Sequence, residues 1–179
     1  MVPLEFGPVV DKIIVDGMPD FSRFNIIDII RNAVAIEHIE LIELTMDIMH
    51  IIPHAITEDS VSEMIAVKDE LGHAYTVHLP LWSIEPASFN KHIRKGSIET
   101  TIEAIDVTKP LEPETYVLHA TGPLAAEFSR LKFPPNMVNL ICGFMASFAA
   151  QSVEEILSRT EIDSRKLAIE NIEFPFDLT

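Results

Sequence analysis

Short runs of apolar, often β-branched residues alternate along the chain with segments in which apolar residues recur every three or four positions. The short runs predict strands buried on both faces, and they span Leu4–Val10, Ile39–Thr45, Ala74–Leu79, Thr115–Ala120 and Lys166–Ile172. The segments between them predict amphipathic helices over Phe24–Ile36, Ser60–Leu71, Ser97–Val107 and Met137–Ser158. A Ser60…Glu63 pair predicts a capping box at the start of the second helix.

Five strands alternating with four helices predict βαβ units, and therefore a parallel sheet in an α/β protein. Such a sheet is either open and doubly wound or part of a (β/α)₈ barrel. The open form normally carries a glycine-rich phosphate turn after its first strand, and no G-x-G-x-x-G motif follows Leu4–Val10. A complete barrel has eight strands and typically about 250 residues. We therefore predict a partial TIM (β/α)₈ barrel of about five βα units, with residues 1–179 forming the N-terminal part of a single domain.

Composition and charge narrow the classes of partner. The formal net charge of −15 disfavours binding to nucleic acid. A single cysteine, Cys142, excludes an internal disulfide and suits a reducing compartment. The first residues lack a basic n-region, and the longest apolar stretch, Met137–Ala150, is too short to span a bilayer. We expect a soluble cytoplasmic protein that binds small molecules rather than nucleic acid or membranes, with its oligomeric state left open.

Ionisable residues stand where three of the predicted strands end. His78, His119 and Glu170 occupy these positions, and Glu43 lies near the end of the strand before them. Ligands bind at the carboxyl ends of strands in parallel α/β folds. Two imidazoles and one carboxylate suit Zn²⁺ or a similar divalent cation. The alternative is that each residue only packs or caps its strand end.

Three further residues are candidate substrate contacts. Arg94 lies in the loop Ser83–Gly96, predicted after the His78 strand and on the same rim. It either reaches inward and grips a substrate phosphate or is simply solvated. Trp82, directly before that loop, could wall a pocket or cap the barrel mouth. Asn171 directly follows Glu170.

Three motifs carry a resemblance to a known group of proteins. They are VHLPLW (Val77–Trp82), VLHATG (Val117–Gly122) and LAIENIEFPF (Leu167–Phe176). With these motifs the chain resembles the first five βα units of the xylose isomerase-like barrel superfamily, which includes sugar isomerases and epimerases and the family 2 apurinic endonucleases. Likeness to the endonuclease branch implies zinc ligation by His78, His119 and Glu170. The stretches ELTMDIMHIIP and LHATGPLAAEFSRL are similar to cobamide-remodelling phosphodiesterases of the same superfamily.

Two functions follow from the residues and the resemblance together. The first is metal-dependent hydrolysis of a small phosphoester, with cobamides as one candidate substrate and Glu170 shared between two ions. The second is isomerisation or epimerisation of a sugar or sugar phosphate with one divalent metal, Mn²⁺ or Mg²⁺ in place of Zn²⁺. In that case Glu170 is a metal ligand, carboxylates transfer protons, and Glu43 contacts the substrate or a ligand. For either reaction, Glu43 is also the expected acceptor for the second ring nitrogen of His78, which would orient that ring. Paired histidines favour the hydrolase, because proton transfer at carbon needs carboxylates more than a second metal. Glu170 and Glu43 are the predicted catalytic residues of either reaction.

Overall fold

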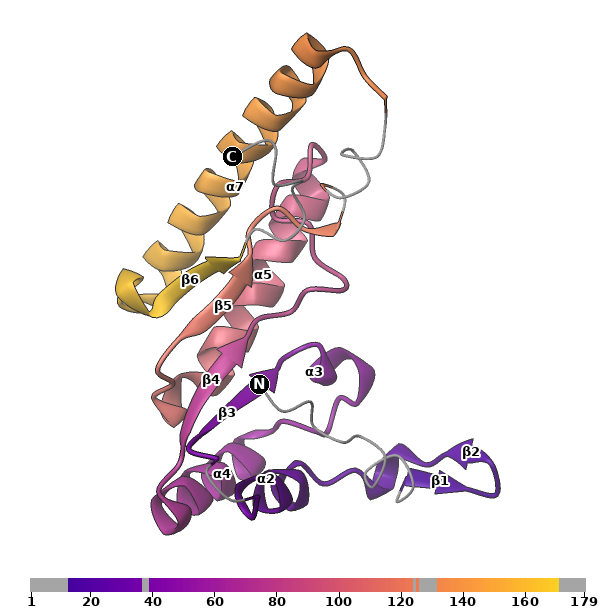
Figure 1. Cartoon of the computed structure of the whole chain (residues 1–179), viewed down its shortest axis with the longest axis vertical. Coiled ribbons are helices and arrows are strands. Elements are labelled where there is room, and N and C mark those ends of the chain that lie inside the picture. Colours follow the sequence, from indigo (N-terminus) through magenta and orange to yellow (C-terminus); the bar gives the residue numbers. More distant parts are fainter. Residues whose placement is uncertain (1–12, 37–38, 124, 126–131, 171–179) are drawn as a thin grey trace.

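A four-stranded parallel sheet organises the molecule. The computed structural model describes residues 13–36, 39–123, 125 and 132–170. Its strands lie side by side in chain order (Figure 1), and they are β3 (Leu41–Thr45), β4 (Ala74–His78), β5 (Tyr116–His119) and β6 (Leu167–Glu170). All three neighbouring pairs are parallel, which confirms the α/β class and the βαβ connections. The fifth predicted strand, residues 4–10, lies outside the described residues.

Helices connect the successive strands, as the alternating pattern predicts. They are α2 (Ile26–Val34) before β3, α3 (Ile48–Ile51) and α4 (Glu58–Leu71) before β4, α5 (Lys91–Thr108) before β5 and α7 (Pro135–Thr160) before β6. Helix α2 packs against α4, and α5 packs against α7. The four predicted helices are present, but α4, α5 and α7 begin earlier than the sequence indicates.

Capping side chains account for the early starts of α5 and α4, whereas α7 begins with Pro135 and has no side-chain cap. In α5, Asn90 accepts a hydrogen bond from the His92 amide at 3.0 Å, which places the helix start at Lys91 rather than Ser97. In α4, the cap is Thr57, whose backbone is extended and whose hydroxyl accepts from the Ser60 amide at 3.2 Å. Ser60 is therefore the third helical residue of the box, and the predicted Ser60…Glu63 pair is wrong.

Short elements complete the described chain. A two-stranded antiparallel hairpin joins β1 (Ile14–Val15) to β2 (Met18–Pro19) and projects from the body of the molecule (Figure 1). Its turn residues, Asp16 and Gly17, both have positive φ, as a tight two-residue hairpin turn requires. Single 3-10 turns form η1 (Phe21–Arg23), η2 (Lys109–Leu111) and η3 (Ser164–Lys166). None of these pieces is long enough to create an apolar period in the sequence.

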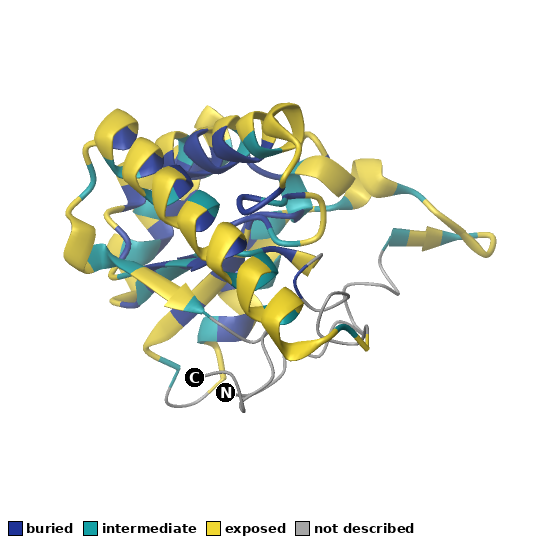
Figure 2. Ribbon diagram, turned by 90° about the horizontal axis from the view of Figure 1, so that it is seen from above, coloured by how far each residue is buried: buried dark blue, intermediate teal, exposed yellow. Residues whose placement is uncertain are grey.

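The two faces of the sheet have different surroundings. Alternate strand residues such as Ile42, Tyr75 and Leu118 are buried and belong to the apolar core shared with the helices (Figure 2). The residues between them, including Glu43 and Thr76, are exposed or half-buried, with the exception of His119. Within the described part of the chain the helices thus cover one face only, so the expectation of strands buried on both faces is wrong there. The less covered face is the one that would line a barrel's interior.

Helix α7 is the longest in the described chain. By length and composition alone, its 26 residues could cross a membrane. From the sequence, the shorter apolar stretch Met137–Ala150 was expected to be too short for this. In the structure, however, Met145, Ala149 and Ile156 are buried in the same core as the sheet, and the helix packs along α5. A helix that covers a parallel sheet in an α/β fold packs in this way.

Candidate metal site

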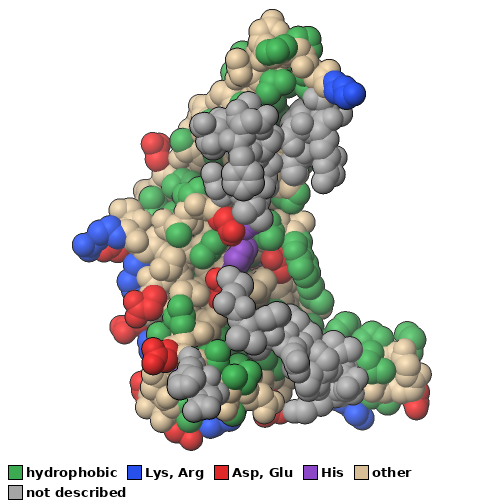
Figure 3. All heavy atoms as spheres, viewed as in Figure 1, with side chains coloured by type: hydrophobic (Ala, Val, Ile, Leu, Met, Phe, Trp, Pro, Cys, Tyr) green, Lys and Arg blue, Asp and Glu red, His purple; other side chains and the backbone are tan. Residues whose placement is uncertain are grey.

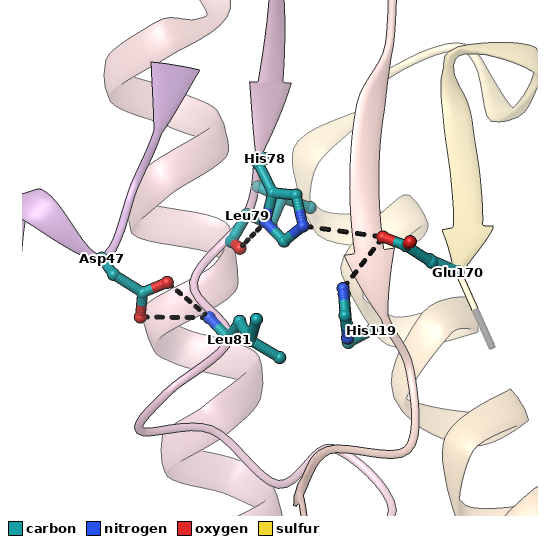
Figure 4. A network of polar contacts seen from close by, with 6 residues as sticks. All are labelled: Asp47, His78, Leu79, Leu81, His119 and Glu170. Carbon is teal, nitrogen blue, oxygen red and sulfur yellow. Dashed lines mark hydrogen bonds and ion pairs between the residues drawn. The ribbon is translucent and has the colours of Figure 1, made fainter. Parts of the chain in front are cut away.

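The three predicted ligands come together at the carboxyl ends of three neighbouring strands. His78, His119 and Glu170 are the last residues of β4, β5 and β6. His119 is the register partner of Glu170, and His78 is paired with Val117, two residues before His119 on the same face. The side chains therefore point toward one another (Figure 4). Histidine and acidic side chains reach the surface together near the centre of this face (Figure 3).

A single carboxylate oxygen lies between the two imidazole rings. Glu170 Oε2 is 3.0 Å from His119 Nε2 and 3.7 Å from His78 Nε2. The ring centroids of His78 and His119 are 5.0 Å apart. The His119 side chain is 1% exposed, His78 15% and Glu170 40%. The cluster is thus closed on the His119 side and open to solvent beside Glu170.

The donor set and its spacing fit a divalent cation. One ligand atom from each residue lies within 4.8 Å of the others. Ligands bound to one ion at about 2.0–2.2 Å can be no more than about 4.4 Å apart. The difference is small enough for side-chain rotation to close it. One carboxylate with two imidazoles also offers a negative charge and borderline nitrogen donors, as Zn²⁺ and similar cations prefer.

His78 is oriented by the backbone of its own strand end. Its Nδ1 lies 3.0 Å from the carbonyl oxygen of Leu79. A carbonyl can only accept, so we assign the proton to Nδ1, and the neutral ring then presents the Nε2 lone pair to the cluster. The sequence hypothesis gave this orienting role to Glu43, and that is wrong. Glu43 is level with Thr76, two strand residues before His78, which is roughly 6.6 Å along the sheet.

Asp47 is a site residue that the sequence hypothesis missed. It follows β3 by two residues and is only 3% exposed. Its carboxylate accepts hydrogen bonds from the amides of Leu81 and Trp82, in the segment that leads away from His78. The rule that found the other residues, an ionisable side chain at a strand's carboxyl end, also applies to Asp47.

Arg94 lies away from the cluster. It belongs to α5 rather than to a loop, and its Nη1 donates to the Ser88 carbonyl at 2.6 Å. Its guanidinium carbon is 4.3 Å from the centre of the Phe148 ring on α7. The predicted inward orientation of Arg94 is therefore wrong, because a partner on α7 and a backbone carbonyl already hold the guanidinium group. Its role in phosphate binding gains no support from this position.

Of the remaining candidates, Glu43 and Trp82 line a pocket, and Asn171 lies outside the described residues. The pocket has a volume of about 330 Å³ and is formed mainly by apolar residues of α2, β3 and α3. Trp82 is 68% exposed there, which agrees with a residue at a pocket wall. Substrate contact by Glu43, Trp82 and Asn171 stays a prediction.

Comparison with known proteins identifies the fold. No known protein family and no curated protein matches this sequence. Among solved structures, the crystal structure of a D-tagatose 3-epimerase-like protein is similar, with a TM-score of 0.54 and 23% sequence identity. The similarity covers 76% of this chain and 46% of that chain, so this chain spans less than half of its neighbour. The described chain therefore has the fold of a partial TIM barrel, with a His-His-Glu cluster at the carboxyl ends of its strands.

Proposed function

We propose that this chain forms the metal-binding part of an enzyme that isomerises or epimerises a sugar or sugar phosphate, within the xylose isomerase-like barrel superfamily. The observation that carries the metal-binding part of the proposal is the convergence of His78, His119 and Glu170 at the strand ends. The structural neighbour, described as D-tagatose 3-epimerase-like, supports the choice of reaction. We infer a small-molecule substrate and a cytoplasmic location, in keeping with the acidic composition and the single cysteine.

The residues of the cluster suit this role. His78, His119 and Glu170 would hold the ion, which when bound would polarise carbonyl and hydroxyl oxygens of the substrate. Glu43 lies on the same face of the sheet, in the strand next to His78. Among the described residues, none forms a hydrogen bond or ion pair with its carboxylate, which suits contact with a substrate or transfer of a proton.

Hydrolysis of a phosphoester is the second candidate function. The donor set favours it, because two imidazoles and one carboxylate are typical of zinc hydrolases. An isomerase that moves a proton between carbon atoms depends more on carboxylates. Action on cobamides, to which two sequence stretches point, gains no support from the structural comparison. We therefore name this substrate only by its class.

Metal titration of the purified chain tests the shared part of both functions. We expect calorimetry with Zn²⁺ and Mn²⁺ to show one site in the wild type and at least tenfold weaker binding in His78→Ala and His119→Ala. His50→Ala is the matched control, because His50 is exposed on α3. Equal affinity in all four proteins would contradict the metal site.

Two assays of the metal-loaded protein then separate the reactions. Interconversion of ketohexoses or their phosphates, followed by chromatography, supports the isomerase or epimerase. Release of nitrophenol from bis(4-nitrophenyl) phosphate supports the hydrolase. Either activity should be lost in His119→Ala. Hydrolysis without any sugar interconversion would overturn the preferred reaction and leave the metal site standing.

A further inference from the structure

A buried carboxylate stands at the end of the strand next to His78. Both oxygens of Asp47 are used. Oδ1 and Oδ2 accept from the Leu81 amide at 3.1 and 3.0 Å (Figure 4), and Oδ1 also accepts from the Trp82 amide at 3.0 Å. An ionised carboxylate is costly to bury without such donors. Asp47 therefore fixes the positions of the Leu81 and Trp82 amides, and their hydrogen bonds in turn stabilise the buried carboxylate.

These contacts continue to the metal site through a very short segment. Leu81 and Trp82 follow Leu79 by two and three residues, and the Leu79 carbonyl is the acceptor for His78 Nδ1 at 3.0 Å. The Met46 amide donates to the His78 carbonyl at 2.9 Å, so the residue before Asp47 is also tied to this strand end. The direction of the Leu79 carbonyl thus depends on a segment that is held at His78 on one side and by Asp47 on the other.

We propose that Asp47 is the positioning residue for His78, and that its carboxylate fixes the ring through the Leu79 carbonyl so that Nε2 faces Glu170. The proposal deepens the metal-site function above and rests on it for its effect on metal binding. Its effect on the His78 ring does not require a metal. Outer groups that orient a ligating histidine typically contribute tenfold to hundredfold to metal affinity.

Two substitutions of Asp47 give graded losses. Asp47→Ala removes both acceptors, whereas Asp47→Asn keeps one carbonyl oxygen for the Leu81 or Trp82 amide. We expect the zinc dissociation constant to rise about tenfold to hundredfold in Asp47→Ala and by less in Asp47→Asn. Ser152→Ala is the matched control, because Ser152 is equally buried and donates to the Pro86 carbonyl at 2.7 Å, in the same connection between β4 and α5.

Nitrogen-15 NMR of the metal-free protein reports the tautomer of the His78 ring directly, and Ser152→Ala shows how far general loosening alone changes it. The His78 ring should be mainly the Nδ1–H tautomer in the wild type and in Ser152→Ala. Asp47→Ala should lower that fraction, and Asp47→Asn should lie between them. An unchanged tautomer in both Asp47 variants overturns the inference, and so does an equal shift in Ser152→Ala.

The outcomes separate this inference from the proposed function. If the wild type binds no zinc but the tautomer changes in Asp47→Ala, the metal site is wrong and the positioning role holds. If the wild type binds zinc and neither the tautomer nor the affinity responds to Asp47, the metal site holds and the positioning role is wrong. Because Asp47→Asn preserves shape and one acceptor, it gives a result even if Asp47→Ala fails to fold.

Discussion

Gly122 allows two connections on the metal-site rim to pack against each other. It lies three residues after His119 and adopts a φ of +75°. A Cβ atom at this position would lie 2.6 Å from Glu85 Oε2, 2.8 Å from the Ile84 carbonyl oxygen and 3.0 Å from Glu85 Cα. The carboxylate could rotate away, but two of these three atoms belong to the backbone. The connection after β4 would have to shift.

The cost of Gly122→Ala follows from these two effects. A non-glycine residue in the left-handed region costs about 1–2 kcal/mol. Forcing backbone to move in a packed region costs about 1–3 kcal/mol more. We therefore expect the free energy of unfolding to fall by about 2–5 kcal/mol, which for a chain of this length lowers Tm by roughly 10 °C.

Gly72 provides the matched control for this prediction. It ends α4 with a φ of +73°, and no atom lies within 4 Å of a Cβ placed there. Gly72→Ala therefore carries only the backbone cost of about 1–2 kcal/mol. Urea unfolding of both variants gives the difference directly. If Gly122→Ala loses no more stability than Gly72→Ala, the contact between the two connections is not tight and the reasoning is refuted.

Three further predictions concern the rest of the fold. Leu118→Ala should lower the free energy of unfolding by about 2–5 kcal/mol in urea, because Leu118 is fully buried; a loss below about 1 kcal/mol would contradict tight packing there. Thr57→Ala should cost about 1 kcal/mol through loss of the α4 cap, while Thr57→Ser should cost little. Burial, with a smaller effect of Lys68, lowers the pKa of His73 below 6.5. The unfolded chain therefore binds a proton at this residue more readily than the folded chain. The contribution of neutral His73 to the free energy of unfolding is fully present above pH about 6.5 and is lost as the pH falls below it. His73→Phe should weaken this fall in thermal unfolding between pH 7 and 5, and an unchanged pH dependence would exclude His73 as its source.

The sequence was informative where one local rule decides the structure. The strands β3 to β6 were predictable because a short apolar run between turn residues usually forms a buried strand in an α/β fold. His78, His119 and Glu170 were predictable as neighbours because the carboxyl ends of parallel strands share one edge. Both inferences require only the order of residues along the chain.

Other features depend on contacts that a local pattern does not contain. The first turn of α5 carries Lys91, His92 and Arg94 with little apolar periodicity, so its start is set by the Asn90 cap. The direction of Arg94 is set by Phe148, which lies 54 residues later on another helix. Which face of the sheet the helices cover is likewise decided by packing, because both faces contain apolar residues.

The separation of the two sheet faces has a consequence for how the strands can pair. A shift of one residue in the pairing of β4 would exchange its faces. Tyr75 and Val77, now buried, would enter the site, and His78 would be forced under the helices without a partner. The same shift in β5 would put His119 where Leu118 is now fully buried beneath the helices, away from Glu170. The residues that give this rim its chemistry thus also penalise misaligned strands, and replacing them with apolar residues should make folding less selective even if the native state becomes more stable.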